Sequence, residues 1–254
     1  MWEEFPPTFF YIYYYMIPSK IFTIIIPCKN EESYIYNTLK SISSQIYLEW
    51  CRVIIADANS TDGTINEIHR AIEDFKNLKI EIIKGGMVSY GRNQGAKLAN
   101  TPYLIFMDAD SVLLDRDILL KTYNTIQYKL YKLITVKQKS TTDDIVDNLI
   151  WKSFNIIRNL LPESFSTGCF FVIKKSVFDY LGGFDETVTQ SEDFILSRQI
   201  PKNYFKILNR YVGQDNRRFK KMGYLNFIKL VMLNYWNKNN IKWFSKDVGY
   251  WNEK

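Results

Sequence analysis

Two carboxylates one residue apart end an apolar run in the middle of the chain. Residues 103–111 read YLIFMDADS, with Asp108 and Asp110 near the end of the run. Its aromatic and branched residues predict a buried strand, and open α/β sheets bind ligands at the carboxyl ends of their strands. Neighbouring carboxylates repel each other, and a divalent cation that prefers hard oxygen ligands relieves the repulsion. The pattern therefore suggests an Mg²⁺ or Mn²⁺ site, with a solvated turn as the alternative.

A second acidic pair, Glu192 and Asp193, begins a helical pattern further along the chain. Carboxylates in the first turn of a helix usually do no more than complement the helix dipole. A carboxylate beside a substrate hydroxyl can instead act as a general base. Both interpretations are open from the residues alone. The one histidine of the chain, His69, excludes the Ser-His and Cys-His nucleophile schemes that need a histidine elsewhere.

A glycine-rich stretch, residues 85–91, precedes Arg92. It is neither a Walker A loop nor a dinucleotide fingerprint, because both patterns are absent. Glycines before a helix can still bring backbone N–H groups to a phosphate, and Arg92 would add a bidentate donor. The alternative is a plain turn with a surface arginine.

The segments between these motifs predict an α/β fold. Strands are expected at residues 21–26, 52–56, 79–83 and 103–111, with helical patterns between them, the last beginning at Arg92. Further patterns predict helices near residues 118–126 and 143–161 and strands near 133–136 and 204–208. Alternation of strand and helix implies a mostly parallel central sheet with helices on both faces.

Composition limits the class of protein and its partners. The chain has 254 residues, of which 46% are hydrophobic and 24% charged, so global disorder is excluded. Its net charge of +6 favours anionic partners, namely nucleotide phosphates, an acidic membrane surface or nucleic acid. Three scattered cysteines favour neither a disulfide framework nor a zinc site and are typical of a reducing compartment; they are Cys28, Cys51 and Cys169.

Both ends of the chain are rich in aromatic residues. Residues 9–17 (FFYIYYYMI) are too short to span a bilayer and could anchor at its surface or pack on the protein. Residues 216–254 interleave lysines with aromatic rings, which is compatible with a membrane surface, with packing on the domain or, least favoured, with single-stranded nucleic acid. We therefore expect segments 1–20, 21–215 and 216–254, the last a basic aromatic helical extension.

The ordered series of motifs from about residue 21 to 200 resembles an inverting family 2 glycosyltransferase of the GT-A fold. The motifs are residues 24–32 (IIIPCKNEE), 55–64 (IADANSTDGT), 91–96 (GRNQGA), 106–111 (FMDADS), 182–186 (GGFDE) and 191–194 (SEDF). The resemblance implies a nucleotide-sugar donor and an acceptor hydroxyl on a glycan, lipid or protein. It also implies a cytoplasmic enzyme, with peripheral membrane contact on the cytoplasmic face as a further expectation.

The resemblance assigns roles to individual residues. Asp108 and Asp110 would hold Mn²⁺ or Mg²⁺, and Asp193, with Glu192 beside it, would supply the general base. Asp57 would contact the base of the nucleotide, Glu31 the ribose region, and Arg92 the base or the diphosphate. The full set implied for donor binding is Pro27, Cys28, Glu31, Asp57, Arg92, Asp108 and Ala109.

Two departures from the family pattern qualify these expectations, and one further motif adds to them. A downstream histidine that often binds the metal is absent, so metal binding would be weaker, or Asp215 or water would take its place. The Gln-x-x-Arg-Trp motif of processive synthases is also absent, which favours transfer of a single sugar. The stretch that begins with Arg217 and Arg218 resembles a basic motif of some family members. This resemblance implies a place near the diphosphate or a lipid-phosphate acceptor.

Two other functions compete with this interpretation. A sugar-phosphate nucleotidyltransferase would share a related architecture, but its glycine-rich, lysine-containing N-terminal loop is missing. A non-catalytic protein that binds sugar nucleotides or membranes on the same fold would explain the missing histidine, whereas both intact acidic pairs argue against it.

Overall fold

The computed structural model describes residues 20–142 and 144–246. The aromatic run at residues 9–17 and the last aromatic residues of the chain lie outside the described residues. The strands are β1 (Phe22–Cys28), β2 (Cys51–Asp57), β3 (Ile80–Lys84), β4 (Tyr103–Phe106), β5 (Val112–Leu113), β6 (Leu133–Ser140), β7 (Phe171–Lys174) and β8 (Phe205–Gln214).

Helices connect and cover these strands. They are α2 (Ile35–Ser43), α3 (Thr64–Asp74), α4 (Val88–Leu98), α5 (Ile118–Tyr128), α6 (Ile145–Leu160), α7 (Lys175–Tyr180), α8 (Glu192–Ser197), α9 (Arg217–Met222), α10 (Tyr224–Trp236) and α11 (Ile241–Phe244). Two 3-10 turns, η1 (Leu48–Trp50) and η2 (Lys202–Tyr204), precede β2 and β8.

The described strands form one mixed sheet in the order β3-β2-β1-β4-β7-β6-β8-β5. The pairs β3–β2, β2–β1, β1–β4 and β6–β8 are parallel, and β7 and β5 pair antiparallel with their neighbours. Most pairings are therefore parallel. This agrees with the α/β sheet that the sequence predicts.

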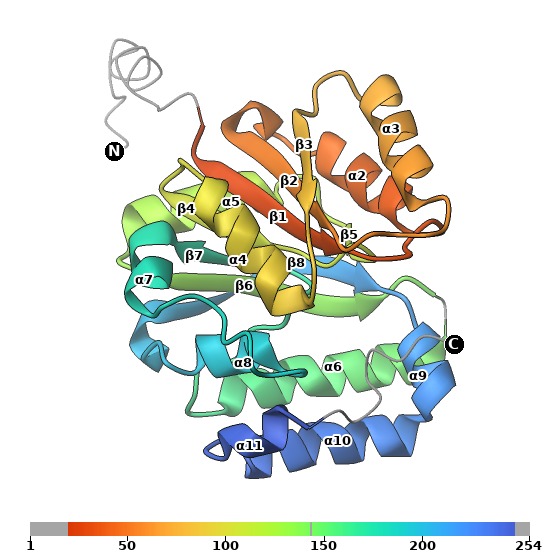
Figure 1. The fold of residues 1–254 in the computed structure, drawn as a ribbon. Coiled ribbons are helices and arrows are strands. Elements are labelled where there is room, and N and C mark those ends of the chain that lie inside the picture. Colours follow the sequence, from red (N-terminus) through yellow and green to blue (C-terminus); the bar gives the residue numbers. More distant parts are fainter. Residues whose placement is uncertain (1–19, 143, 247–254) are drawn as a thin grey trace, which may run out of the picture.

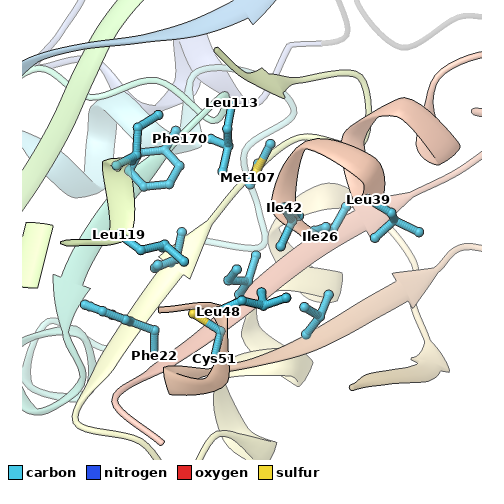
Figure 2. Close-up of a cluster of buried hydrophobic side chains, with 14 of the residues drawn as sticks. Phe22, Ile26, Leu39, Ile42, Leu48, Cys51, Met107, Leu113, Leu119 and Phe170 are labelled. Carbon is cyan, nitrogen blue, oxygen red and sulfur yellow. The ribbon is translucent and has the colours of Figure 1, made fainter. Parts of the chain in front are cut away.

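Successive residues of the central strands point to opposite faces of the sheet, as the two-residue period of a strand requires. Ile26 of β1 packs with Leu39 and Ile42 of α2 in the cluster shown in Figure 2. Its neighbour Ile25 packs on the other face with Ala96 of α4. Helices thus cover both faces, and Figure 1 shows α4 crossing in front of the sheet.

Helix α4 begins earlier than the sequence predicts. The glycines predict a chain break before Arg92, whereas the helix begins at Val88. The prediction is wrong because Gly91 and Gly95 lie four residues apart on the face that packs on the sheet. A Cβ at Gly95 would lie 2.5 Å from Cγ2 of Ile25, and one at Gly91 would lie 3.3 Å from Cβ of Ala56. The glycines therefore bring the helix close to β1 and β2.

Two strands of the second half are longer than predicted, and their extra length shapes the site. The expected strand at residues 133–136 continues to Ser140, and the one at 204–208 continues to Gln214. The short strand β5, which follows Asp110, pairs with the end of β8, so that Val112 lies opposite Gly213. This pairing brings the residues after β8 beside the turn that carries Asp108 and Asp110.

Helix α6 exposes several apolar side chains and buries two charged ones. It buries Asp147, Trp151 and Arg158, whereas Ile145 is 83% exposed and Leu160 is 76% exposed.

In Figure 1, α10 and α11 lie below α6, away from α2 and α3. Of the helices in the described ranges, none has both the length and the apolar composition needed to cross a bilayer.

The two glycines of α4 give a matched test of this packing. Gly95→Ala should lower the free energy of unfolding by about 1–3 kcal/mol more than Gly91→Ala, because its new methyl group overlaps a fully buried isoleucine. Both changes gain about the same helix propensity, roughly 1 kcal/mol. Urea denaturation of the two variants measures the difference. Equal stability of the two would contradict the close approach at Gly95.

Candidate active site

The loops after β1 and β2 are joined by side-chain hydrogen bonds. Asn30 Oδ1 accepts the N–H of Thr61 at 2.9 Å, and Ser60 Oγ accepts the N–H of Asn30 at 3.0 Å. Asp57, the last residue of β2, accepts the hydroxyl of Ser60 at 2.6 Å and its N–H at 3.1 Å. Asn30 and Asn59 have φ of 53° and 57°, which is uncommon outside glycine. This corner therefore holds Asp57 in a defined orientation at the edge of the sheet.

Three predicted donor-binding residues contribute backbone rather than polar side chains. Pro27 and Cys28 end β1, and the carbonyl of Cys28 accepts the N–H of Ala58 at 2.8 Å. The carbonyl of Ala109 accepts the hydroxyl of Thr38 at 2.7 Å. Burial raises the pKa of the Cys28 thiol well above its ordinary value, so this thiol stays protonated.

Arg92 joins the two acidic motifs. Its Nη2 lies 2.6 Å from Oδ1 of Asp108, and its Nη1 lies 2.5 Å from Oε1 of Glu192. Burial opposes the charge, but the two carboxylates raise the pKa of Arg92 above its ordinary value. The sequence predicts an arginine that contacts the donor. That contact stays a prediction; the structure places Arg92 between two carboxylates, with its side chain 1% exposed.

Gly168 lies where the side chains of Arg92, Asp108 and Asp193 come together. Its N–H donates to Oδ2 of Asp193 at 2.5 Å. A Cβ at this position would lie 2.8 Å from Oδ1 of Asp108 and closer still to Arg92. Only glycine therefore allows the backbone to reach Asp193 without displacing the ion pair.

Asp193 has the environment of a general base. Oδ2 accepts from Gly168, and Oδ1 accepts the N–H of Phe194 at 2.6 Å. Burial and the charge of Glu192 raise the pKa of Asp193 to about 7, against the opposing effect of Arg92. A carboxylate with a pKa near 7 is well matched to accept a proton at neutral pH.

Glu31 and Asp110 share one arginine that comes from the far end of the sheet. Nη2 of Arg217 lies 2.8 Å from Oε1 of Glu31 and 2.7 Å from Oδ2 of Asp110. Its guanidinium also stacks on Tyr34, with Cζ 4.3 Å from the ring centroid. Burial raises the pKa of Glu31 to about 7, although the hydrogen bond from Arg217 lowers it. The predicted metal ligand Asp110 therefore has a cationic neighbour in this structure.

The charge of the site bears on whether it suits a metal ion. Five carboxylates surround two arginines here; they are Glu31, Asp108, Asp110, Glu192 and Asp193, with Arg92 and Arg217. One carboxylate oxygen, Oε2 of Glu31, is buried without a hydrogen-bond partner in the described part of the chain. An excess of hard anionic oxygens is what Mn²⁺ or Mg²⁺ prefers. Among residues 20–142 and 144–246, no group of three His, Cys, Asp or Glu side chains is arranged so that it could hold a metal ion.

The GGFDE motif at residues 182–186 forms a turn that is bound to Asn93 of α4. Oδ1 of Asn93 accepts the N–H of Phe184 at 3.0 Å, and its Nδ2 donates to the carbonyl of Phe184 at 2.9 Å and to Oε1 of Glu186 at 2.7 Å. Gly182 and Gly183 have φ near +80°, at 82° and 80°, which favours glycine. The turn is thereby tied to α4, one residue after Arg92.

A cavity of about 120 Å³ opens beside these groups. Asp108 and Asp193 line one part of it, and Trp151 of α6 with Phe227 and Tyr235 of α10 lines another. Nε1 of Trp151 is buried with no hydrogen-bond partner among the described residues. A buried polar group of this kind is costly unless a ligand or water satisfies it. The cavity therefore offers an aromatic wall with polar capacity next to the candidate base.

The C-terminal extension is part of this site. Asn234 of α10 donates to Oγ of Ser191 at 2.9 Å and accepts from Nε1 of Trp243 at 2.8 Å. Phe244 is fully buried, and its carbonyl accepts the N–H of Thr189 at 2.9 Å. Of the roles considered for the extension, packing on the domain is what the described residues 216–246 show.

Sequence reasoning missed Gly168 and Asn234 as site residues. In the sequence, Gly168 is one residue of a loop that leads into β7. A lone glycine does not indicate which side chains will lie against it. Asn234 is one asparagine in an apolar helix, where a buried polar residue is a weak signal of a specific contact. Asp215, one of the expected replacements for the missing histidine, accepts the N–H of Arg217, the first residue of α9, at 2.6 Å.

Sequence comparisons place the chain among sugar-transferring proteins. A family model described as "Glycosyl transferase family 2" matches residues 23–182. "Uncharacterized glycosyltransferase YfnE" of Bacillus subtilis is 35% identical over 99 residues, 39% of this chain and 25% of that protein. "O-antigen chain rhamnosyltransferase RfbN" of Salmonella typhimurium is 24% identical over 201 residues, 73% of this chain and 62% of that protein. The chain spans less than two thirds of either relative.

Solved structures share the fold. Mannosyltransferase PcManGT from Pyrobaculum calidifontis, in complex with GDP-Man and Mn²⁺, has a TM-score of 0.62 at 18% identity and covers 89% of this chain and 72% of that one. S. aureus TarS 1-349 in complex with UDP-GlcNAc has a TM-score of 0.60 at 19% identity, with 77% and 58% covered. These likenesses confirm the GT-A type of α/β fold that the sequence predicts.

The raised pKa of Asp193 has a measurable effect on stability. A carboxyl group whose pKa rises from 3.8 to about 7 on folding stabilises the fold fully below pH 4 and loses this contribution as pH rises through 7. The unfolding free energy of wild type should therefore fall relative to Asp193→Asn between pH 4 and 8, at up to about 1.4 kcal/mol per pH unit. Thermal and urea unfolding of both proteins across this range measures the difference. A difference independent of pH would contradict the assignment.

Proposed function

Since this chain belongs to glycosyl transferase family 2, we propose that it moves one sugar from a nucleotide-sugar donor to an acceptor hydroxyl, with inversion at the anomeric carbon. The observation that supports the proposal most directly is the joining of Asp108 to Glu192 by Arg92, since Asp108, Glu192 and the candidate base Asp193 all line one cavity.

The proposed chemistry is a single displacement. Asp193 takes the proton from the acceptor hydroxyl as the oxygen attacks the anomeric carbon. The bond from that carbon to the diphosphate breaks, and the nucleoside diphosphate leaves from the opposite side. Gly168 fixes the carboxylate by its N–H, and Arg92 holds Glu192 beside it without taking part in the proton transfer.

The donor is expected along the carboxyl ends of β1, β2 and β4. Asp57 would contact the nucleotide base and Glu31 the ribose, with backbone contacts from Pro27, Cys28 and Ala109. The complexes of the structural neighbours name UDP-GlcNAc and GDP-Man as ligands of those proteins, so sugars on UDP and GDP are the first donors to examine.

A divalent metal fits this reading of the site. Asp108 and Asp110 would hold Mn²⁺ or Mg²⁺, and the bound ion would neutralise charge on the leaving diphosphate. Two observations support a metal site. Carboxylates outnumber arginines here, and Oε2 of Glu31 has no hydrogen-bond partner among the described residues. The proposal also includes the roles given to the site residues and a cytoplasmic location. It places the boundary between the glycosyltransferase domain and the extension at residues 215 and 216.

The acceptor would enter from the cavity beside Asp193. The aromatic walls from α6 and α10 suit the faces of a sugar ring or an apolar group. Nε1 of Trp151 and Oε1 of Gln138 are both buried and unpartnered in the described part of the chain. They offer one donor and one acceptor to hydroxyl groups of the bound acceptor.

A thermal-shift screen of UDP- and GDP-sugars tests the donor and the metal together. One nucleotide sugar at about 100 times its dissociation constant should stabilise wild type by about 2.7 kcal/mol, and only with Mn²⁺ or Mg²⁺ present. Asp110→Ala should lose this stabilisation. Asp193→Asn should keep it but turn over roughly 10²–10⁴ times more slowly.

Asp179→Asn serves as the control, because this exposed carboxylate pairs only with Lys175 on the surface of α7 in the described structure. It should bind and turn over like wild type. Donor binding by wild type without transfer to any acceptor, and without hydrolysis, would favour a non-catalytic sugar-nucleotide protein. No stabilisation by any donor with any metal would overturn the proposal.

Peripheral membrane contact is a second part of the proposal. Leu225 (83% exposed), Ile228, Met232 and Trp236 form a stripe along the outer side of α10. They line a shallow groove with Lys229. An apolar helix face with basic neighbours suits an anionic bilayer, which accepts the apolar side chains and attracts the lysines. Within residues 216–246, Phe219 and Phe244 are buried, and Phe227 and Tyr235 line the cavity. These positions disfavour stacking on nucleic acid.

Vesicle sedimentation tests this contact. Wild type should bind vesicles that contain phosphatidylglycerol, less so at high salt, and weakly bind phosphatidylcholine alone. Replacement of Leu225, Met232 and Trp236 by glutamine should weaken binding at least tenfold, since each buried apolar side chain is worth about 1.5–3 kcal/mol.

The matched control replaces Tyr128, Leu130 and Tyr180, which are equally exposed but lie on other surfaces. It should bind vesicles like wild type. Equal binding by the α10 variant and the control would clear α10 of a membrane role.

A further inference from the structure

A second hollow lies between helix α6 and the last strands of the sheet, apart from the carboxylates around Arg92. It is a groove of about 1000 Å³, and Figure 1 shows α6 below β6 and β8. Clefts of roughly 300–1,000 Å³ hold small ligands in proteins. The groove therefore has room for several linked chemical groups rather than for a single ion.

The periods of a strand and of a helix together produce the lining of the groove. Lys137 and Lys139 are two residues apart on β6, as are Asn209 and Tyr211 on β8, so each pair points to one face of the sheet. Residues of α6 that are three or four positions apart, and so share one side of the helix, form the opposite wall. They are Asn148, Lys152, Asn155 and Asn159. The lining is therefore rich in amide and amino groups.

The charge of the groove is positive. Three of its four charged side chains are cationic; they are Lys137, Lys139 and Lys152, with Asp115. Oδ2 of Asp115 accepts the N–H of Tyr211 at 2.7 Å, and Nζ of Lys137 donates to Oδ1 of Asn209 at 2.8 Å. Among residues 20–142 and 144–246, none of the three lysines forms an ion pair. They can therefore pair with an anionic ligand.

Three residues that line the groove each have a buried polar atom with no hydrogen-bond partner in the described part of the chain. The atoms are Oδ1 of Asn148, Nε1 of Trp151 and Oε1 of Gln138. Such an atom costs free energy until a ligand or water satisfies it. A hydroxyl group can satisfy any of the three, because it both donates and accepts a hydrogen bond. The groove therefore suits a ligand that carries hydroxyl groups as well as negative charge.

The groove adjoins the cavity beside Asp193. Gln138 and Trp151 line both hollows. Asn155 accepts the N–H of Gln138 at 3.0 Å and donates to its carbonyl at 2.7 Å, which fixes α6 against the end of β6. A long ligand in the groove would therefore lie next to the candidate base.

We propose that this groove binds an anionic glycan, a chain of sugars that carries carboxylate or phosphate groups. The lysines pair with its charges, and the amides and the indole N–H bind its hydroxyl groups. A nucleic acid would need exposed rings on which to stack its bases, whereas Trp151 is buried. The inference rests on the proposed function only where it takes this glycan to be the acceptor, whose end would enter the cavity beside Asp193.

Calorimetric titration with two pairs of oligosaccharides tests the proposal. Oligogalacturonate carries carboxylates and phosphomannan carries phosphates, and their neutral counterparts are methyl-esterified oligogalacturonate and dephosphorylated mannan. Wild type should bind one charged glycan about tenfold more tightly than its neutral counterpart, and the preferred pair identifies the charged group. The difference should shrink at high salt, which screens exposed charges.

Two variants separate the charges from the hydroxyl contacts. Lys139→Gln with Lys152→Gln should weaken binding of the preferred charged glycan about tenfold, roughly threefold for each exposed charge pair. Its neutral counterpart should change by less than about twofold. Trp151→Phe keeps an aromatic ring but removes Nε1, and it should weaken both members of the pair alike, by about threefold to tenfold.

The matched control is Lys76→Gln with Lys79→Gln. It removes the same charge from two exposed lysines just before β3, which is at the opposite edge of the sheet from β5 and β8. This control should bind both glycans like wild type.

Four outcomes would each overturn the inference: binding of neither charged glycan, equal binding of charged and neutral glycans, equal weakening by the two lysine variants, or tighter binding of single-stranded DNA. The groove variant should bind UDP and GDP like wild type, because its lysines lie outside the donor site. Failure of wild type to bind any nucleotide sugar would overturn the proposed function and the role of the glycan as acceptor. The lysine variants would still decide whether the groove binds the glycan.

Discussion

A buried guanidinium between two carboxylates is the interaction on which this site depends. Arg92 reaches Asp108 on one side and Glu192 on the other, residues that are far apart in the chain. Removing one partner of a buried ion pair leaves a charge without compensation and costs about 3–5 kcal/mol. The motif that carries Asp108 and the motif that carries Glu192 therefore keep their relative position only while Arg92 is in place.

Three neutral residues determine the position of the Arg92 guanidinium. Gly95 brings α4 against β1, Asn93 ties the helix to the turn before α8, and Gly168 leaves room beside Asp108. Each is a small residue or an amide rather than a charged one. The neutral residues around the charged groups thus determine the distances between the charges.

The sequence predicts the first half of the fold well, because β1, β2 and β4 are buried on both faces and read as apolar runs of strand length. The order of the motifs then indicates the edge of the sheet where they meet. Neither signal reports contacts between distant segments. The position of Arg92 could not be predicted, since glycines that usually end a helix here lie inside one. Arg217 could be recognised as basic, but its approach to Asp110 depends on the two-residue strand β5, which is too short to have a pattern.

The contact between Asn234 and Ser191 changes how the chain can be divided. The extension follows the sheet in sequence and looks like an appendage, yet it supplies a wall of the cavity and holds the residue before Glu192. The smallest transferable unit is therefore neither the segment that matches the family model nor the segment that ends with β8. A chimaera that exchanges the extension would exchange one wall of the cavity and the support of Glu192 together, so the two features are inherited as one.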